Sequence, residues 1–412
     1  MFGSAFIDAT SVLPVFLSTL TSSAVLIGLS ATIRQVGWTL PQVLVARHVA
    51  RLERKKGVVI VAAAVQRTVL FAVALVTMAY ARSRPELTLW AFLLGLAVFS
   101  LADGVTSVPW TDIMGKCVEH TRRGRLLGSM QVIGGTFAFA AGLAVRAIIS
   151  HPSLPYPYDF AVLFAAGAAL LTVSLACFWR VQEPAWQPPA RPQESLGRYL
   201  REVPRLFHRN PAAGRLVAVR ILVSGINLAA PFFAVYGREA LGFPAAAAGL
   251  FVSVQMAGLV AGGVAWARIA DFRGNRLLVM MSALVSVLAP AVPLAVGLLG
   301  PGPAGRMVYP VSFFLLGMAF SGAWMGCTNY LLEITDQASR PFYLGAVNTL
   351  IAPFGFFGVL GGVIVASSGY GACFGLAAGL SLAGLALASG LPEPRAGGVP
   401  VAGEEATPTT NG

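Results

Sequence analysis

Charged residues are scarce in this chain. Only 11% of the 412 residues are Asp, Glu, Lys or Arg, whereas 56% are hydrophobic. A soluble domain carries about 25% charged residues. So few charges cannot cover a globule of this size with a polar surface. The composition therefore excludes a soluble fold and indicates that lipid covers much of the protein.

Acidic residues are the scarcer charges. The chain has 17 Asp and Glu against 29 Lys and Arg, which gives a formal net charge of +12. A basic balance can indicate nucleic-acid binding. Here the Lys and Arg gather in polar segments on one side of the apolar runs, so we expect no nucleic-acid partner.

Metal-binding and nucleophilic motifs are also lacking. None of the four His lies in the middle of an apolar run, and no G-x-x-x-x-G-K-[ST] loop for ATP occurs. The cysteines fit neither a zinc site nor a disulfide framework, which predicts free thiols at Cys117, Cys177, Cys327 and Cys373. We therefore expect no metal, no cofactor and no enzymatic activity.

Long apolar runs are abundant. A helix needs about 20 apolar residues to cross the hydrocarbon core. Six such runs precede a polar break and six follow it, which predicts an all-α membrane protein with twelve transmembrane helices in two six-helix bundles. The runs are residues 2–20, 24–46, 57–81, 87–113, 124–149 and 158–179, then 213–236, 245–270, 277–299, 307–332, 342–366 and 370–390.

The two sets of runs repeat each other about 221 residues apart. Gly28 reappears as Gly249, and the acid at Asp112 reappears as Glu333. Two equivalent halves made of membrane spans are typical of transporters built from repeats. The two bundles should therefore be pseudo-symmetric.

The polar break divides the chain into regions. We expect an N-terminal bundle over 1–180, a cytoplasmic linker over 181–211, a C-terminal bundle over 212–391 and a disordered tail over 392–412. Apolar residues of the linker recur at helical spacing, which favours a short amphipathic helix on the membrane surface; a plain solvated linker fits equally well. These residues are Leu196, Tyr199, Leu200 and Val203.

The distribution of Lys and Arg predicts the orientation. They fall mainly on one side of the spans, which is therefore cytoplasmic, and an even number of spans places both termini there, at the cell (inner) membrane. The first span is short, because seven residues precede Asp8 whereas about fourteen residues of the seventh span precede Ala229, its equivalent. We hypothesise that the first helix is truncated and that translation starts upstream of Met1.

The segment 266–276, Trp-Ala-Arg-Ile-Ala-Asp-Phe-Arg-Gly-Asn-Arg, resembles the G-x-x-x-D-R-x-G-R-R loop of the major facilitator superfamily. Asp271, Gly274 and Arg276 match that pattern, while Ala267 and Phe272 depart from it. The equivalent loop of the first half keeps its basic end but has Ala50 in place of the acid. The resemblance extends over the whole chain in span count, linker and repeat.

The resemblance implies a cytoplasmic gate. Asp271, with Arg276 in the same loop, would face the start of the fifth span near Arg123 and Gly124, because a helix N-terminus favours a carboxylate. A solvated turn residue is the alternative for Asp271. Two further acid–base pairs could hold the same gate at equivalent positions of the two halves, namely Asp112 with Arg123 and Glu333 with Arg340.

Four charged residues lie near the middle of spans in the first half. An ionisable group at membrane depth is costly and indicates a functional site. Asp8 or Asp103 could carry a coupling proton, with its protonation set by a nearby Arg. Static structural pairing is the alternative. The four residues are Asp8, Arg34, Arg67 and Asp103.

Other polar residues also lie deep in the spans. A solute at the midplane between the halves needs such hydrogen-bonding groups, although each could instead hold two helices together. The candidate substrate-pathway residues are Gln131, Arg220, Asn227, Gln255, Asn329 and Asn348.

The sequence thus predicts a monomeric secondary active transporter that contacts membrane lipids. It would move a small-molecule solute by alternating access, with proton as the coupling ion. The fifth span lacks the Gly-Pro element usual in drug/proton antiporters of the superfamily, which argues against a standard multidrug antiporter. The alternatives are a lipid or lysolipid flippase of the same fold and a non-transporting membrane sensor.

Overall fold

The computed structural model describes residues 2–49, 52–118, 120–184, 207, 210–300, 302–336 and 340–394, and these are almost entirely helical, without a strand. The first half contains α1 (Phe2–Ala5), α2 (Val12–Leu20), α3 (Ala24–Val49), α4 (Lys56–Tyr80), α5 (Pro85–Cys117), α6 (His120–Ile149) and α7 (Tyr158–Trp179). The second half contains α9 (Pro211–Val223), α10 (Ile226–Glu239), α11 (Ala247–Arg273), α12 (Asn275–Leu299), α13 (Pro303–Val308), α14 (Val311–Glu333), α15 (Arg340–Ile351), the 3₁₀ helix η1 (Ala352–Phe356) and α16 (Phe357–Ser389).

Most of these helices are long and apolar enough to cross a membrane. In the described part of the chain, nine helical stretches meet that condition. The last of them has 47 residues, about 70 Å at 1.5 Å per residue, which is enough for two crossings. It turns at Gly369, whose φ of 81° favours glycine. With α3 and the short first span, the helices account for the twelve predicted runs.

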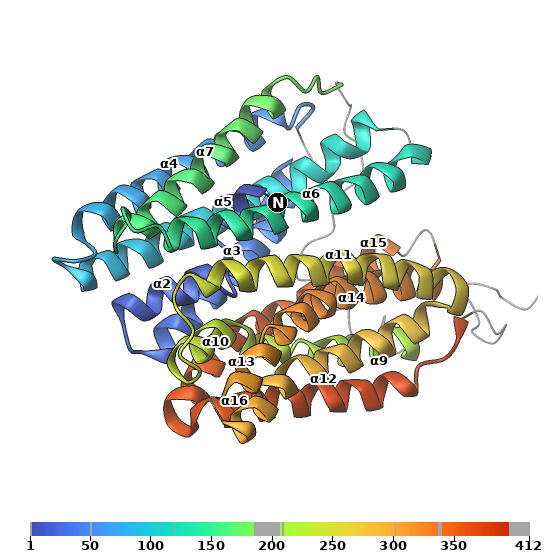
Figure 1. Cartoon of the computed structure of the whole chain (residues 1–412). Helices are drawn as coiled ribbons and strands as arrows, with labels where there is room; N and C mark the ends of the chain where they lie inside the picture. The colour runs from blue at the N-terminus through green and yellow to red at the C-terminus, as the bar shows by residue number, and fades with distance from the viewer. Residues whose placement is uncertain are drawn as a thin grey trace, which may run out of the picture.

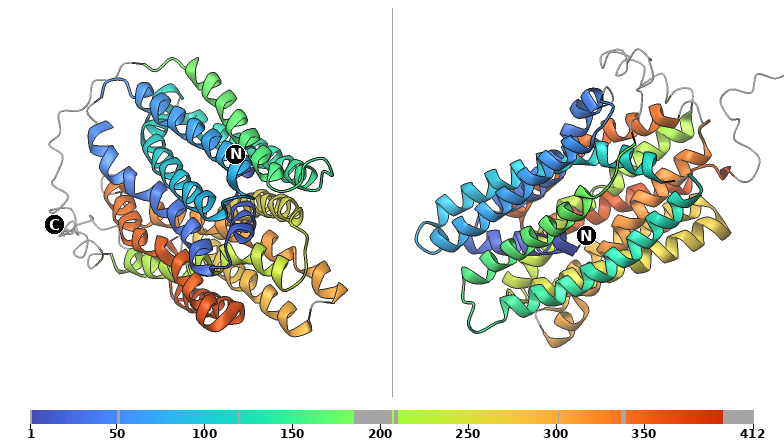
Figure 2. Two further views of the ribbon diagram at one scale, coloured as in Figure 1. Left: turned by 90° about the vertical axis from the view of Figure 1, so that its left-hand side faces the viewer. Right: turned by 90° about the horizontal axis from the view of Figure 1, so that it is seen from above.

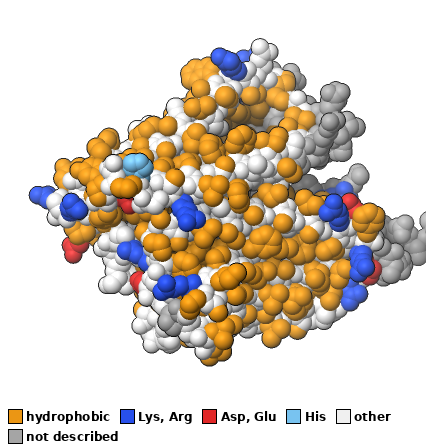
Figure 3. Space-filling view, in the orientation of Figure 1, with side chains coloured by type: hydrophobic (Ala, Val, Ile, Leu, Met, Phe, Trp, Pro, Cys, Tyr) orange, Lys and Arg blue, Asp and Glu red, His pale blue; other side chains and the backbone are white. Residues whose placement is uncertain are grey.

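The helices form two groups that lie side by side (Figure 1). The blue to green helices α3 to α7 make one group, and the yellow to red helices α9 to α16 make the other, while α2 extends toward the second group. The helices run roughly parallel to one another in both further views (Figure 2). Hydrophobic side chains cover most of the visible face, and charged ones gather mainly toward its two ends (Figure 3). This distribution suits a protein whose long axis crosses a bilayer.

Three spans are interrupted, although the hydropathy pattern predicts them as continuous helices. The first breaks between α1 and α2 around Asp8, the seventh breaks between α9 and α10 at Gly225, and the eleventh breaks at η1, which contains Pro353. Pro lacks a backbone N–H and Gly weakens a helix. Such breaks persist at membrane depth because neighbouring helices and polar side chains satisfy the freed backbone groups.

The expected latch segment is mostly helical. Residues 266–273 form the last two turns of α11, and a single glycine, Gly274 with φ 88°, leads directly into α12. The sequence pattern was interpreted as a loop, but the positive φ of one glycine is enough to reverse the chain here. The predicted linker helix at 196–203 lies outside the described residues.

In the described part of the chain, the two halves contact each other most extensively where α6 packs on α11 and α3 packs on α16. Smaller contacts join α3 with η1 and α10, and α2 with α10 and α11. Glycines make the closest approaches, because a Cβ atom at Gly28 would overlap the carbonyl oxygen of Gly358, and one at Gly249 would overlap that of Gly142. Gly28 and Gly249 are the repeated glycines, so the repeat marks equivalent positions at the contact between the halves.

Candidate functional site

A network of four polar side chains lies inside the first half. The guanidinium of Arg34 on α3 pairs with Asp103 on α5 at 2.8 Å and lies 5.2 Å from the ring centroid of Phe99. The Gln66 amide on α4 donates to the other Asp103 oxygen at 3.0 Å, and Arg67 donates to Gln66 at 2.5 Å. The structure therefore brings together three of the four predicted deep charges. We call Arg34, Gln66, Arg67 and Asp103 the Arg34–Asp103 network.

Arg67 fixes this network to its surroundings. Its guanidinium also donates to the carbonyl oxygens of Ala63 at 2.9 Å and Leu171 at 3.1 Å, so it connects α4 with α7. Backbone carbonyls can satisfy a guanidinium that lies far from water. Arg67 thus has enough partners for a structural role, whereas Arg34 and Asp103 depend mainly on each other.

A cavity of about 340 Å³ adjoins the network. Its walls come from α3, α4, α5 and α7 and include Val59, Thr106 and Trp110. The residues 221 positions later pack against α9 in a second core cluster and are Met280, Cys327 and Leu331. In the second half, α9 therefore occupies the space that corresponds to the cavity of the first half. The hypothesis of a truncated first helix stays a prediction.

Asp8 lies in the break of the first span, apart from this network. One of its carboxylate oxygens accepts the backbone N–H of Thr10 at 2.9 Å and of Ser11 at 2.8 Å. The Thr10 hydroxyl is 2.7 Å from the same oxygen and 2.6 Å from Oε1 of Gln255 on α11. Asp8 thereby caps the start of α2, and Thr10 connects the two halves.

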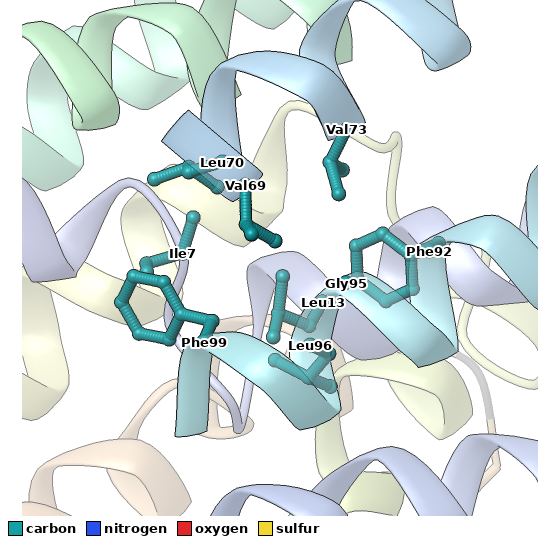
Figure 4. A pocket seen from close by; sticks show the side chains of 9 residues that line it. All are labelled: Ile7, Leu13, Val69, Leu70, Val73, Phe92, Gly95, Leu96 and Phe99. Atoms are coloured by element: carbon teal, nitrogen blue, oxygen red, sulfur yellow. The ribbon is translucent and has the colours of Figure 1, made fainter. Parts of the chain in front are cut away.

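A small apolar cavity lies between the break of the first span and the helices α4 and α5. Ile7 and Leu13, on either side of the break, face Val73 and Phe92 across a volume of about 20 Å³ (Figure 4). A water molecule needs polar partners to occupy such a space, and the lining side chains are all apolar. The lining therefore offers no hydrogen-bond partner to a water molecule in this cavity.

The other predicted pathway residues are distributed over both halves. Gln255 is 3% exposed in the contact between the halves, and Gln131 on α6 faces Gly263 on α11. Five of the predicted pathway side chains make no hydrogen bond within the described part of the chain, and their role stays a prediction. They are Gln131 on α6, Arg220 on α9, Asn227 on α10, Asn329 on α14 and Asn348 on α15.

Three residues of the predicted gate, Asp112, Arg276 and Arg340, have described partners within their own halves. Asp112 pairs with Lys55 at 2.8 Å and Lys116 at 3.0 Å; the side chain of Arg123, its predicted partner, lies outside the described side chains. Glu333 ends α14 and Asp271 is exposed near the end of α11. Their predicted pairings stay predictions.

Two arginines of the predicted gate cap helix ends instead. Arg340 donates to the carbonyl oxygens of Leu332 at 2.9 Å and Thr335 at 3.2 Å, just where α14 ends. Arg276 donates to the carbonyl oxygen of Ser389 at 2.7 Å at the end of α16. Cations at helix C-termini satisfy orphan carbonyls and oppose the negative end of the dipole.

Glu183 is a functional candidate that the sequence analysis missed. Its side chain is 1% exposed and pairs with Lys116 at 3.1 Å, and it accepts the backbone N–H groups of Lys55 and Lys56 at 2.7 and 2.8 Å. It therefore caps α4 and ties the end of the sixth span to the third and fourth. The signal was a Glu-Pro pair after both the sixth and the twelfth spans, Glu183-Pro184 and Glu393-Pro394.

Glu183→Gln should lower the stability of the protein by about 3 kcal/mol. The change removes the buried ion pair between Glu183 and Lys116 and leaves the Lys116 charge without one of its two partners. Thermal unfolding in detergent measures the loss as a lower Tm. Glu393→Gln is the matched control, since one Glu393 oxygen is buried without a hydrogen-bond partner, and it should change the Tm less. Equal losses in the two variants would contradict the role of Glu183.

Arg238 connects the halves near the end of α2. It donates to the Ser18 hydroxyl at 2.8 Å and to the carbonyl oxygen of Val15 at 3.4 Å. Both acceptors lie in the last two turns of α2, where a cation is favoured. This contact must break if the two halves separate on this side.

Arg238→Met should increase separation of the halves at this end by about tenfold, since it removes a charged hydrogen bond. The rate at which a membrane-impermeant maleimide labels a cysteine placed at Thr21 measures that separation. Arg82→Met is the control, because Arg82 is exposed on the loop after α4. An unchanged labelling rate in Arg238→Met would exclude a sealing role.

Two repeated halves of membrane-spanning helices, with charges paired at membrane depth, are typical of membrane transport proteins. The sequence profile of the Major Facilitator Superfamily matches residues 1–358 and 223–411, and the chain belongs to this family. It is a transporter, not an enzyme. No curated protein sequence matches the chain significantly.

Solved structures share the fold at low sequence identity. The chain is similar to a D-xylose–proton symporter (15% identity, 96% of each chain covered, TM-score 0.72). It is also similar to the nucleoside transporter NupG, as a D323A mutant (14%, 95% of this chain and 96% of that one, 0.70). A third is a bacterial homologue of the iron transporter ferroportin in an inward-facing state (11%, 94% of each chain, 0.70).

Proposed function

We propose that this protein is a secondary active transporter that moves a polar small-molecule solute by alternating access and couples this movement to a proton. The observation that carries the proposal is the environment of Asp8. Its described partners are hydroxyl and backbone N–H groups, with no cation among them. A carboxyl group of this kind can gain and lose a proton without breaking an ion pair.

The available polar side chains support a polar solute. Asn227, Asn329 and Asn348 offer amide donors and acceptors, and Arg220 offers a cation, without hydrogen-bond partners of their own in the described part of the chain. Arg220, Asn227 and Asn329 are half-buried and Asn348 is exposed, so a polar solute that reaches them can form the hydrogen bonds that they lack. Structural relatives named for a pentose and for nucleosides fit this chemistry.

A ligand thermal-shift screen of the purified protein at pH 5.5 and 7.5 tests the proposal. The panel should contain pentoses, hexoses, nucleosides and lysolipids. We expect a polar hit whose binding depends on pH in the wild type, and loses that dependence in Asp8→Asn. Unchanged pH dependence in both Asp8→Asn and Asp103→Asn would exclude both coupling carboxyls, and a hit confined to lysolipids would favour the flippase alternative.

Transport itself is the second test. In proteoliposomes with an internal pH-sensitive dye, addition of the hit should move protons in the wild type and move at least about tenfold fewer in Asp8→Asn, because a neutral amide cannot carry a proton. Solute flux without proton flux in the wild type would indicate facilitated diffusion and contradict coupling.

The orientation and the regions are part of the same proposal. Because Lys and Arg gather on one side, both termini lie in the cytoplasm and the two bundles span residues 1–180 and 212–391. Reporter fusions after Gly412 and within the predicted outer loop at Gly302 test the orientation. A reporter active only outside the cytoplasm when fused after Gly412 would reverse it.

A further inference from the structure

Thr10 occupies an unusual position between two acceptors. Its hydroxyl oxygen lies 2.7 Å from an Asp8 carboxylate oxygen and 2.6 Å from Oε1 of Gln255. A hydroxyl carries a single hydrogen, so it cannot donate to both. Which acceptor receives the hydrogen depends on whether Asp8 supplies one of its own.

The contact with Gln255 is satisfied in one protonation state. When the Asp8 oxygen nearest Thr10 is protonated, Asp8 donates to Thr10 and Thr10 donates to Gln255, so every hydrogen lies between one donor and one acceptor. When Asp8 is ionised, charge assistance draws the Thr10 hydrogen to the carboxylate. The Thr10 and Gln255 oxygens are then two acceptors at 2.6 Å with no hydrogen between them, which is unfavourable.

This pair of contacts crosses the boundary between the halves. Asp8 and Thr10 belong to the first span, and Gln255 lies on α11 of the second half, 245 residues away in the sequence. Gln255 is 3% exposed, so water does not readily replace Thr10 as its partner. An unfavourable contact at this point therefore acts directly on the contact between the halves.

The neighbouring charged groups are engaged elsewhere. Arg34 and Asp103 pair with each other, Asp112 and Lys116 pair near the end of α5, and Arg238 binds the opposite end of α2. Among the described side chains, the other charged groups on helices packed against α1 and α2 lie toward the helix ends: Glu86 on α5, Arg146 on α6, Asp159 on α7, Glu239 on α10, and Arg268, Asp271 and Arg273 on α11. Asp8 is thus the ionisable group in contact with Thr10.

We propose that Thr10 is a positioning residue that links the proton on Asp8 to the contact between the halves through Gln255. The proposal rests on the proposed coupling role of Asp8. Asp8 takes a proton from water and its charge changes from −1 to 0, while the Thr10 hydrogen turns from Asp8 toward Gln255 by rotation of its hydroxyl. Protonation therefore favours the closed contact, and loss of the proton favours its opening.

Distance measurements between spin labels test this link without a solute. Cysteines at the exposed positions Ser83 and Gly302, in a background lacking the four native cysteines, report the separation of the halves in lipid nanodiscs. Between pH 5 and pH 8 we expect the ratio of open to closed protein to rise about 2- to 10-fold, which corresponds to one neutral hydrogen bond.

Matched variants separate a relay from a structural role. Thr10→Ser keeps the hydroxyl and should keep the pH profile. Thr10→Val has the same shape without the hydroxyl and should flatten the pH profile. Gln255→Met should flatten it too and replaces Thr10→Val as the test if the valine variant does not fold. A wild-type pH profile in Thr10→Val, or in Gln255→Met where the valine variant does not fold, would overturn the proposal.

Asp8→Asn distinguishes this proposal from the proposed function. If Asp8→Asn is flat while Thr10→Val titrates like the wild type, the relay fails and coupling by Asp8 stands. If Asp8→Asn titrates like the wild type, both fail. If Asp8→Asn and Thr10→Val are flat and Thr10→Ser titrates, both are supported.

Discussion

Gly28→Leu should hold the two halves apart and reduce transport by about 100-fold. A Cβ atom at Gly28 would overlap the carbonyl oxygen of Gly358, and one at Gly358 would lie 2.5 Å from the carbonyl oxygen of Gly28. Backbone atoms cannot turn away as a side chain can, so α3 and α16 must separate. Overpacking of this kind costs about 3 kcal/mol. The clash arises only when α3 lies against α16, so it destabilises the closed state relative to the open one.

The measurement is the same spin-label distance between Ser83 and Gly302, together with uptake of the solute found by the thermal-shift screen. Gly375→Leu is the control, because it lies on α16 where a Cβ atom meets nothing within 4 Å. It should leave both readings unchanged. Normal uptake and a closed distance in Gly28→Leu would show that this glycine contact is not required in the transport cycle.

Asp103→Asn should abolish most transport and lower stability by about 2 kcal/mol. The change leaves the Arg34 guanidinium at membrane depth without its ion-pair partner. Breaking a fully buried pair costs about 3–5 kcal/mol, and the cost is smaller here because the two side chains are 27% and 31% exposed. Thermal unfolding and proteoliposome uptake measure the two effects separately.

The double variant Arg34→Met with Asp103→Leu decides between coupling and static pairing. It removes both charges, and apolar residues in place of a buried pair are often neutral or stabilising. If the pair is structural, the double variant should regain both the Tm and the uptake of the wild type. If the pair takes part in the cycle, the Tm should return while uptake stays low.

Hydropathy and the cost of buried charge explain the predictions that the fold confirms. The apolar runs form helices because lipid offers no hydrogen-bond partners, so the backbone N–H and C=O groups must bond to each other. Arg34 and Asp103 meet because isolated charges at that depth are costly. The partner of each charge could not be read from the sequence, since the two residues are 69 positions apart and nothing in their spacing encodes the packing of α3 on α5.

Other features depend on packing that a single sequence does not show. The role of Gly28 emerges only when α3 lies against α16, although its repetition as Gly249 was visible. Gln255 was predicted to contact a solute, and the structure gives it Thr10 as a partner across the halves. Glu183 was missed because its partners Lys55 and Lys116 are charged residues of other loops and helix ends, which the positive-inside pattern explains without a specific contact.

The break in the eleventh span has a mechanical consequence. On one side of the break, α15 packs against α9 and α14 of its own half. On the other side, η1 and α16 also contact α3 of the other half, while Gly361 of α16 packs on Leu228 of α10 in its own half. One segment of the span therefore touches both halves and the other touches one, so a rotation between the halves acts on the two segments unequally. Pro353 has no N–H to bond, so η1 bends at lower cost than an intact helix. Residues 352–356 are therefore the point at which this span bends when the two halves rotate against each other.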